Sequence, residues 1–216
     1  MAVRKQKSGA KRKPQVHPAH YMHQYDSLGR WASYWYQIHE IIDKKPESVL
    51  EIGIGNKTVL NYLRQQNIEV TGVDIDARLK PDVVADVTDL SVFQSDSFDV
   101  VACCEVLEHL PFDNFDRTLK EIHRVAKKWV VISLPHFGPF FTFSFHLVRF
   151  NPLKVAIKLP FPRKHVFNGQ HYWEVGKIGF SVRKISSHIN KAGFEIVKQF
   201  HVFENPDHLF FVLQKI

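Results

Sequence analysis

One stretch, residues 48–56 (SVLEIGIGN), limits what this chain can fold into. Its first half is an apolar run interrupted by a single acid, which predicts a parallel strand buried on both faces. Gly53 and Gly55 follow and allow a sharp turn whose backbone amides stay open to a ligand. Residues 57–66 then show the apolar spacing of an amphipathic helix. Strand, glycine turn and helix together predict a nucleotide-binding α/β unit.

The charge beside the turn indicates which nucleotide this unit binds. A dinucleotide site keeps acids away, because its helix N-terminus and amides hold anionic phosphates. Here Glu51 stands two residues before Gly53, and Thr58 occupies the place of the third glycine in G-x-G-x-x-G. A carboxylate at this point repels pyrophosphate and attracts a ligand that carries an ammonium and a sulfonium group. We therefore predict S-adenosylmethionine as the cofactor.

Two further acids follow short predicted strands. Asp74 ends the strand 69–73, 19 residues after Gly55, which is about the distance at which an acid of a βαβ unit reaches the ribose hydroxyls. Asp86 follows the next strand, where its carboxylate could accept a hydrogen bond from the adenine amino group while Val87 packs against the ring. An aspartate that stabilises a turn is an equally good interpretation of Asp86.

The remaining elements complete an α/β domain. Apolar runs and turn residues predict two more buried strands, two helices and a closing antiparallel pair of strands, at 98–103, 129–134, 114–126, 181–192, 194–203 and 208–213. The expected fold is a doubly wound, mostly parallel sheet of seven strands with an antiparallel last strand.

Five segments resemble class I S-adenosylmethionine-dependent methyltransferases, most closely the small bacterial type 11 branch: VLEIGIGN, VTGVDID, ADVTDL, FDVVACCEVLEHL and WVVISLP. The resemblance is strongest over residues 48–135 and implies the Rossmann-like methyltransferase fold. It departs at Lys57, where many members have a further glycine. It puts His109 on the acceptor side. It implies that the cofactor is held by Glu51, Gly53 and Gly55 at the methionine end, by Asp74 and Ile75 at the ribose and adenine, by Asp86 and Val87 at the adenine edge, and by Cys104 and Glu105 chiefly through their backbone.

A second set of candidate catalytic residues lies in the segment HYWE before the last helix. His171 or Glu174 could be the general base that removes a proton from the acceptor. A turn held in the core by Trp173 is an equally good interpretation. We expect no metal site, since the histidines of residues 17–23 lack a thiol or an acid in fixed geometry.

Residues 136–170 form an insert with six phenylalanines within residues 137–150; prolines interrupt the insert repeatedly, and basic residues follow the phenylalanines. Three interpretations remain open: a lid over an apolar acceptor pocket, a peripheral membrane contact with lysines towards anionic headgroups, or a dimer contact. Binding of RNA by aromatic stacking is less favoured, because the aromatic residues are nearly all Phe in one block. We therefore expect a small-molecule, glycan or lipid-like acceptor, methylated at oxygen.

The basic charge is concentrated at the N-terminus. Six of the net +7 charges fall within the first thirteen residues, and the rest of the chain carries 23 basic and 22 acidic residues. We expect residues 1–20 to be a disordered tail and residues 21–216 to be the methyltransferase domain. Two adjacent cysteines and no secretory signal favour a cytoplasmic protein, with the inner membrane face as a possible contact.

The domain is expected to begin with an aromatic helix, capped at Asp26 or Ser27. Its apolar stripe is predicted either to cross the mouth of the cofactor cleft or to pack in the core, and it comprises Leu28, Trp31, Trp35, Ile38 and Ile42. Two alternative functions stay open. One is an RNA or protein methyltransferase guided by the basic tail. Nucleic acid is the less favoured acceptor, because CCEV stands where an NPPY-type tetrapeptide would mark methylation of a nucleic-acid amino group. The other alternative is a non-catalytic module that binds S-adenosylmethionine.

Overall fold

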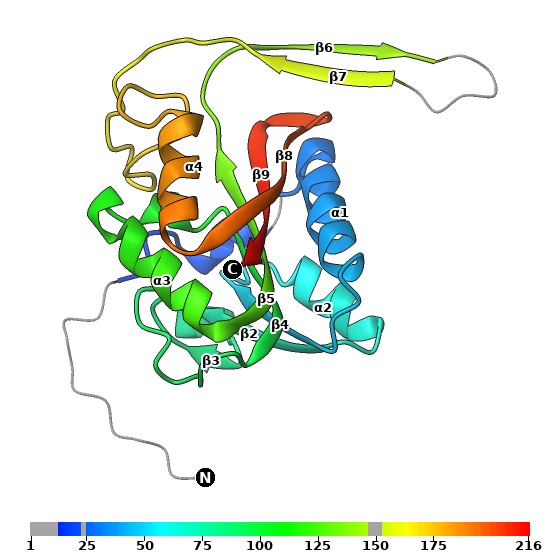
Figure 1. Ribbon diagram of the computed structural model, residues 1–216, viewed down its shortest axis with the longest axis vertical. Helices are drawn as coiled ribbons and strands as arrows, with labels where there is room; N and C mark the ends of the chain where they lie inside the picture. The colour runs from blue at the N-terminus through cyan, green and yellow to red at the C-terminus, as the bar shows by residue number, and fades with distance from the viewer. Residues whose placement is uncertain (1–12, 23–24, 147–152) are drawn as a thin grey trace.

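A seven-stranded sheet runs through the computed structural model, which describes residues 13–22, 25–146 and 153–216 (Figure 1). Its strand order is β3-β2-β1-β4-β5-β9-β8. Strands β3, β2, β1, β4 and β5 pair in parallel, and β9 pairs antiparallel with both β5 and β8. The strands are β1 (Ser48–Ile52), β2 (Glu69–Asp74), β3 (Val83–Val84), β4 (Phe98–Cys104), β5 (Ala126–Pro135), β8 (Phe194–Val202) and β9 (Asn205–Lys215). The predicted doubly wound sheet with an antiparallel last strand is confirmed.

Helices cover both faces of the sheet (Figure 1). Helices α1 (Leu28–Ile42) and α2 (Thr58–Gln65) pack on one face, and α3 (Phe115–Val125) and α4 (Val182–Lys191) on the other, each pair over its own apolar core. Four short 3-10 helices lie in the connections: η1 (Pro18–Tyr21), η2 (Ala77–Leu79), η3 (Leu107–His109) and η4 (Phe112–Asn114). Among the described residues, no helix is both long and apolar enough to cross a membrane.

The strand order reverses between β1 and β4, whose following elements leave towards opposite faces. In an open α/β sheet, ligands bind in the crevice beyond the carboxyl ends of the strands at such a switch point. The glycine turn after β1 lies at this place, and so does the segment CCEVLEHL, which contains the last two residues of β4 and continues beyond the strand.

Helix α1 begins where predicted, since the Ser27 side chain accepts a hydrogen bond from the backbone N–H of Arg30. Most of its apolar stripe does not pack in the core, however: Leu28 is 83% exposed, and Trp31, Trp35 and Ile42 also face solvent, while Ile38 is half-buried against the core. The helix instead turns a mainly polar face inward. Ser33 Oγ accepts from Asn205, and Glu40 pairs with Lys198 at 2.9 Å. The prediction that this stripe packs in the core was therefore wrong for four of its five residues, Ile38 being the exception.

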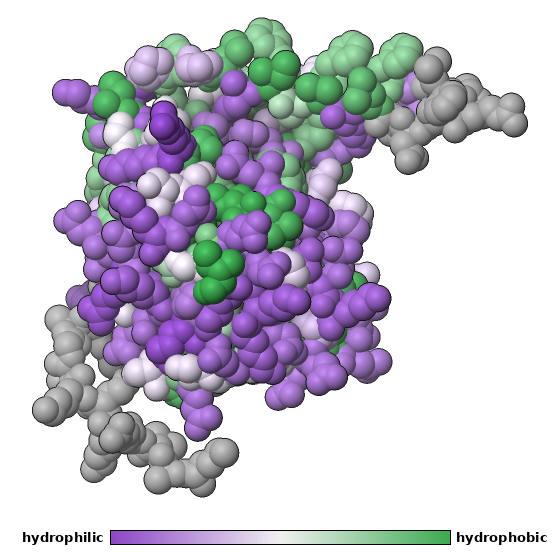
Figure 2. Space-filling model, viewed as in Figure 1, coloured by the Kyte–Doolittle hydropathy of each residue, from purple (hydrophilic) through white to green (hydrophobic). Residues whose placement is uncertain are grey.

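The phenylalanine-rich insert forms a two-stranded ribbon, β6 (Phe140–Phe145) and β7 (Leu153–Lys158), that stands apart from the main sheet (Figure 1). Side chains directly opposite each other in antiparallel strands share one face. The register pairs Phe141 with Ile157, Phe143 with Val155, and Phe145 with Leu153, so one face of the ribbon is wholly apolar. Figure 2 shows hydrophobic residues gathered along this ribbon.

The opposite face of the ribbon is tied to the domain. Lys154 Nζ lies 2.7 Å from Glu204 Oε1, and Lys158 pairs with Asp207. Glu204 lies in the connection between β8 and β9, and Asp207 lies near the start of β9. The two lysines that were expected to face anionic headgroups are therefore engaged within the protein.

Part of the predicted tail is built into the domain. Residues 13–16 and His20 of η1 line the cavity described below, so the folded unit begins before residue 21. Residues 1–12, which carry five basic and no acidic side chains, lie outside the described residues.

Candidate active site

A cavity of about 490 Å³ opens at the carboxyl ends of β1 and β4. All nine residues predicted to bind the cofactor line it: Glu51, Gly53, Gly55, Asp74, Ile75, Asp86, Val87, Cys104 and Glu105. His109 and His171 line the same cavity, whereas Glu174 does not. The described phenylalanines of the insert are also absent from its wall, so the ribbon is not the predicted lid over this pocket.

The turn after β1 has the conformation that its glycines allow. Gly53 has φ +81°, and a Cβ atom there would lie 2.3 Å from Cγ2 of Val106. Its N–H donates to the Val73 carbonyl at 2.8 Å, which ties β1 to β2 at the cavity floor. Lys57, at the position where the family often has glycine, takes a left-handed φ of 63°. The backbone of this turn can therefore approach a ligand closely.

Glu51 places a buried carboxylate against this turn. It is 7% exposed, and its Oε2 has no hydrogen-bond partner. Burial raises the pKa of Glu51 to about 8. An unpaired buried carboxyl group is costly unless a cation or a donor meets it. The ammonium group of an amino-acid ligand would satisfy Glu51, so the residues present fit the methionine end of S-adenosylmethionine.

Asp74 stands at the end of β2, where the nucleoside would lie. Its Oδ1 accepts the N–H of Asp76 at 2.9 Å, which orients the carboxylate. Burial raises the pKa of Asp74, while backbone hydrogen bonds lower it. Asp76 caps η2 through the N–H of Arg78 and pairs with its guanidinium, so its role is structural. The position of Asp74 is compatible with the predicted contact to the ribose.

The other predicted cofactor residues are partly engaged in the protein itself. Asp86 Oδ1 accepts from the backbone and the hydroxyl of Thr88, so the turn role is present while the residue still lines the cavity. Glu105 Oε1 accepts from Ser133 Oγ at 2.8 Å. The backbone N–H of Glu105 also donates to the Ser133 carbonyl at 3.0 Å, so the predicted backbone contact of Glu105 with the cofactor stays a prediction. Burial raises the pKa of the Cys104 thiol, which makes it a poor nucleophile.

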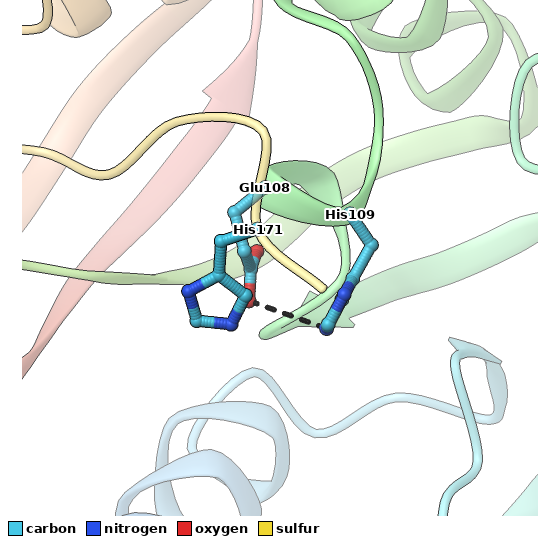
Figure 3. Close-up of side chains that lie close together, drawn as sticks. All are labelled: Glu108, His109 and His171. Atoms are coloured by element: carbon cyan, nitrogen blue, oxygen red, sulfur yellow. Dashed lines mark ion pairs between the residues drawn. The ribbon is translucent and has the colours of Figure 1, made fainter. Parts of the chain in front are cut away.

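Two of the candidate catalytic residues, His109 and His171, lie side by side in the cavity wall (Figure 3), and Glu174 stands behind His171. The rings of His109 and His171 are 5.0 Å apart between centroids. His171 Nδ1 lies 3.1 Å from Oε1 of Glu174, and this hydrogen bond is the main cause that lowers the pKa of Glu174. Glu174 thus stands behind His171 as an ionised acceptor that orients the ring. Burial lowers the pKa of His109 to about 4, so this imidazole is neutral near pH 7.

Glu108 is a residue of this site that sequence reasoning missed. It is fully buried, and neither of its carboxylate oxygens has a hydrogen-bond partner. Its Oε1 lies 3.8 Å from Nε2 of His109. Burial, with the nearby Glu105 as a second cause, raises the pKa of Glu108 well above its usual range. Charged residues usually lie at the surface, so the sequence does not predict a buried Glu108. The only signal was that Glu108 directly precedes His109 in EVLEHL.

The N-terminal segment is the other part of the site that was missed. The ring of Tyr21 lies over the glycine turn, 3.5 Å from where a Cβ atom of Gly55 would stand. Tyr25 packs edge-on against Tyr21, and Arg30 stacks on Tyr25 at 3.9 Å. These residues, with Tyr34 of α1, line the cavity mouth. The aromatic and histidine content of HPAHYMHQY was the available signal.

Comparison with known proteins agrees with this geometry. The model of a protein family described as a methyltransferase domain matches residues 50–132 of this chain. These residues contain the glycine turn, Asp74, Asp86 and His109. No curated protein matches the chain in sequence. Residues 50–132 therefore match a methyltransferase domain, and the residues that line the cavity fit S-adenosylmethionine as its cofactor.

Solved structures of methyltransferases share the fold. The 1,6-didemethyltoxoflavin-N1-methyltransferase of Burkholderia thailandensis is 20% identical, with a TM-score of 0.60, and the match covers 88% of this chain and 80% of that one. The N-methyltransferase NodS of Bradyrhizobium japonicum is 10% identical (TM-score 0.61; 88% and 89% covered). Magnesium protoporphyrin IX methyltransferase of Synechocystis is 13% identical (TM-score 0.61; 88% and 84% covered). At these identities the likeness concerns the fold alone.

Proposed function

We propose that the enzyme transfers the methyl group of S-adenosylmethionine to an oxygen atom of a small-molecule, glycan or lipid-like acceptor. The observation that carries this proposal is the pair of imidazoles, His109 and His171, which line the same cavity as Glu51 and the glycine turn with their ring centroids 5.0 Å apart; we take them to mark the acceptor end of the cavity. The cofactor supplies an activated methyl group, so the protein has to align the acceptor, exclude water and, for a hydroxyl, accommodate the leaving proton.

His171 is suited to accept that proton. Glu174 accepts a hydrogen bond from Nδ1, which leaves the unprotonated Nε2 of His171 for the acceptor. His109 is held in the same way, because its Nδ1 lies 3.1 Å from the carbonyl oxygen of Gln170. An amine acceptor that is already nucleophilic would have no need of two oriented imidazoles, and this favours a hydroxyl.

The test is product analysis with methyl-labelled cofactor. The purified chain is incubated with carbon-13 methyl S-adenosylmethionine and, separately, with polar metabolites, lipids and RNA extracted from a bacterial culture. The carbon chemical shift of the labelled product distinguishes an O-methyl from an N-methyl group. We expect an O-methyl signal in the metabolite or lipid fraction. An N-methyl product, or a product in RNA alone, contradicts the proposal.

The ribbon supports a peripheral membrane contact as part of this function. Its apolar face is exposed, with Phe141 at 67%, while Lys154 and Lys158 on the other face are paired with acids of the domain. An amphipathic element that fastens its polar face to its own domain leaves the apolar face to a lipid interface. The proposed occupant is the membrane interface, and a second copy of the chain is the competing one.

Vesicle flotation separates these occupants. Replacing Phe141 and Phe143 with Ser should abolish binding to neutral and anionic vesicles alike, since the lysines are already paired. Analytical ultracentrifugation without lipid should show the same sedimentation for the wild type and the double variant. A wild-type dimer that dissociates in the variant would instead assign the ribbon to a second copy.

Removal of the basic N-terminus distinguishes a nucleic-acid methyltransferase from an enzyme that acts on a small acceptor. A nucleic-acid enzyme would depend on residues 1–12 and lose affinity steeply with salt. We expect a chain that lacks these residues to turn over a small acceptor at an unchanged rate. A non-catalytic module would bind S-adenosylmethionine and release no S-adenosylhomocysteine with any of the fractions above.

A further inference from the structure

Three side chains at the acceptor end of the cavity form a cluster that methyl transfer alone does not account for. One donor atom from each of Glu108, His109 and His171 lies within 4.8 Å of the others (Figure 3). Glu108 and His109 come from η3, directly after β4, and His171 comes from the segment before α4. The fold thus brings together residues more than sixty positions apart in the chain.

The hydrogen bonds around the two rings determine which nitrogens are available. His109 Nδ1 faces the carbonyl oxygen of Gln170 at 3.1 Å, and a carbonyl can only accept. His171 Nδ1 faces the carboxylate of Glu174 at 3.1 Å, which is likewise an acceptor. Both rings therefore carry their proton on Nδ1 and keep a lone pair on Nε2. Histidines that ligate metals are held in this manner, by a carbonyl or carboxylate on the second nitrogen.

The third side chain needs a partner. Both oxygens of Glu108 are buried and without a hydrogen bond, and the nearest nitrogen with a lone pair, His109 Nε2, has no proton to donate. Glu105 does not help, since its carboxylate bonds Ser133 and faces His208. A cation between Glu108 and the two imidazoles would satisfy all three groups at once.

We propose that Glu108, His109 and His171 bind a divalent transition-metal ion at the acceptor end of the cavity. Two imidazoles and one carboxylate suit zinc or manganese, whereas magnesium and calcium prefer sites made of oxygen ligands. With ligand distances of about 2.0–2.2 Å, side-chain shifts of about 1 Å bring the three donors around one ion. Three protein ligands leave a position open for an oxygen atom of the acceptor.

The catalytic role of this ion depends on the proposed function, which is methylation of a hydroxyl group. Methylation of a hydroxyl forms a carbon–oxygen bond, breaks the bond between the methyl carbon and sulfur, and releases the hydroxyl proton to solvent. A cation beside the oxygen lowers the pKa of the hydroxyl and favours that release. In the metal-bound site, Nε2 of His109 and of His171 would be ligands, so the hydroxyl proton would go to solvent; His171 accepts that proton only when the ion is absent.

Calorimetric titration of the full chain with zinc chloride and with manganese chloride tests the site. We expect one ion per chain. Glu108→Gln and His171→Ala should each weaken its affinity by about 10–100-fold. His39→Gln is the matched control, because His39 is exposed on α1 far from the cluster, and it should leave the affinity unchanged. Ions bound to other histidines are recognised because none of the cluster variants affects them.

Anomalous scattering from crystals soaked in manganese should locate the ion between the three side chains. The unfolding temperature of Glu108→Gln should be no lower than that of the wild type. A loss of metal affinity in this variant would then not result from unfolding. Equal affinity of wild type and Glu108→Gln for both metals, or no binding, overturns the proposal. Metal binding without any O-methyl product would contradict the proposed function and leave the metal site standing.

Discussion

The indole N–H of Trp173 donates a hydrogen bond to the carbonyl oxygen of Leu110 at 3.1 Å, inside the core. This bond joins the two segments that carry the acceptor end of the cavity, because Leu110 follows His109 and Trp173 stands between His171 and Glu174. The turn held in the core by Trp173 is thus present, whereas the role of His171 or Glu174 as a general base stays a prediction. Trp173 holds the segment in the core, and its neighbours face the cavity or support it.

Replacing Trp173 with Phe should destabilise the protein and spread the cluster. The buried Leu110 carbonyl loses its donor, which costs about 1–3 kcal/mol, and the smaller ring adds a cavity. Chemical denaturation measures the loss. The control is Trp35→Phe on the exposed face of α1, where a change within about 0.5 kcal/mol is expected. Equal effects of the two substitutions would contradict this account of the Trp173 bond.

Glu51→Gln should weaken binding of S-adenosylhomocysteine by tenfold or more, because the ammonium group loses its carboxylate partner. The raised pKa of Glu51, about 8, means that the free protein holds a proton that binding displaces. Wild-type affinity should therefore rise with pH between about 6 and 7.5, whereas the affinity of the variant should change less. Calorimetry in buffers of different ionisation enthalpy detects the released proton, and a wild type that releases none would contradict this role of Glu51.

Glu51 also makes the folding stability depend on pH, but in the opposite direction from ligand affinity: stability falls as pH rises. A carboxyl with a raised pKa in the folded state stabilises the protein fully below its unfolded pKa of about 4.5, and this contribution is lost as pH rises towards 8. Without ligand, Glu51→Gln should therefore lose less stability than the wild type between pH 5 and pH 8 in urea unfolding. Parallel curves would show that Glu51 is ionised in the free protein.

Gly53→Ala should be more damaging than the same change at another glycine with positive φ. The new methyl group meets Val106 at 2.3 Å, so overpacking of about 1–3 kcal/mol adds to backbone strain of about 1–2 kcal/mol. Gly169→Ala is the matched control, since Gly169 has φ +93° and no atom within 4 Å. The double variant Gly53→Ala/Val106→Ala should recover the overpacking part. No recovery in unfolding free energy would show that the backbone conformation alone requires glycine.

Acid should destabilise the protein through a pair of histidines outside the cluster. His136 Nδ1 and His201 Nε2 are 2.7 Å apart, and burial followed by His201 lowers the pKa of His136 to about 4. As pH falls from 6.5 to 4, the unfolded chain binds protons that the folded chain refuses, so stability falls. His201→Gln removes one of these groups and should give a shallower decline in urea unfolding. An unchanged slope would contradict the linkage.

The elements that a local pattern determines were predictable. Strand β1, the glycine turn and α2 follow from adjacent residues, and the parallel order of the strands brings Glu51, Asp74 and Asp86 to one cavity. The N-cap of α1 at Ser27 was likewise predictable, because capping depends on one side chain and the next turn.

Features that depend on distant contacts were not predictable. The apolar stripe of α1 satisfies the helical period, but periodicity does not say whether a stripe faces its own core. Here polar contacts of Ser33 and Glu40 to distant strands turn the stripe outward. Glu108 lies deep in the protein because the segment around Trp173 covers it, and this packing has no counterpart in the local sequence.

Calorimetric titration with S-adenosylhomocysteine tests the central claim most directly, namely that the carboxylates beside the glycine turn hold S-adenosylmethionine. The wild type should bind one molecule per chain and ignore NAD. Asp74→Ala should bind about 10–100-fold more weakly with an unchanged unfolding transition, because bonds from a charged group to two hydroxyls are lost. A wild type that ignores S-adenosylhomocysteine and captures NAD, or an Asp74→Ala variant with full affinity, would contradict the account.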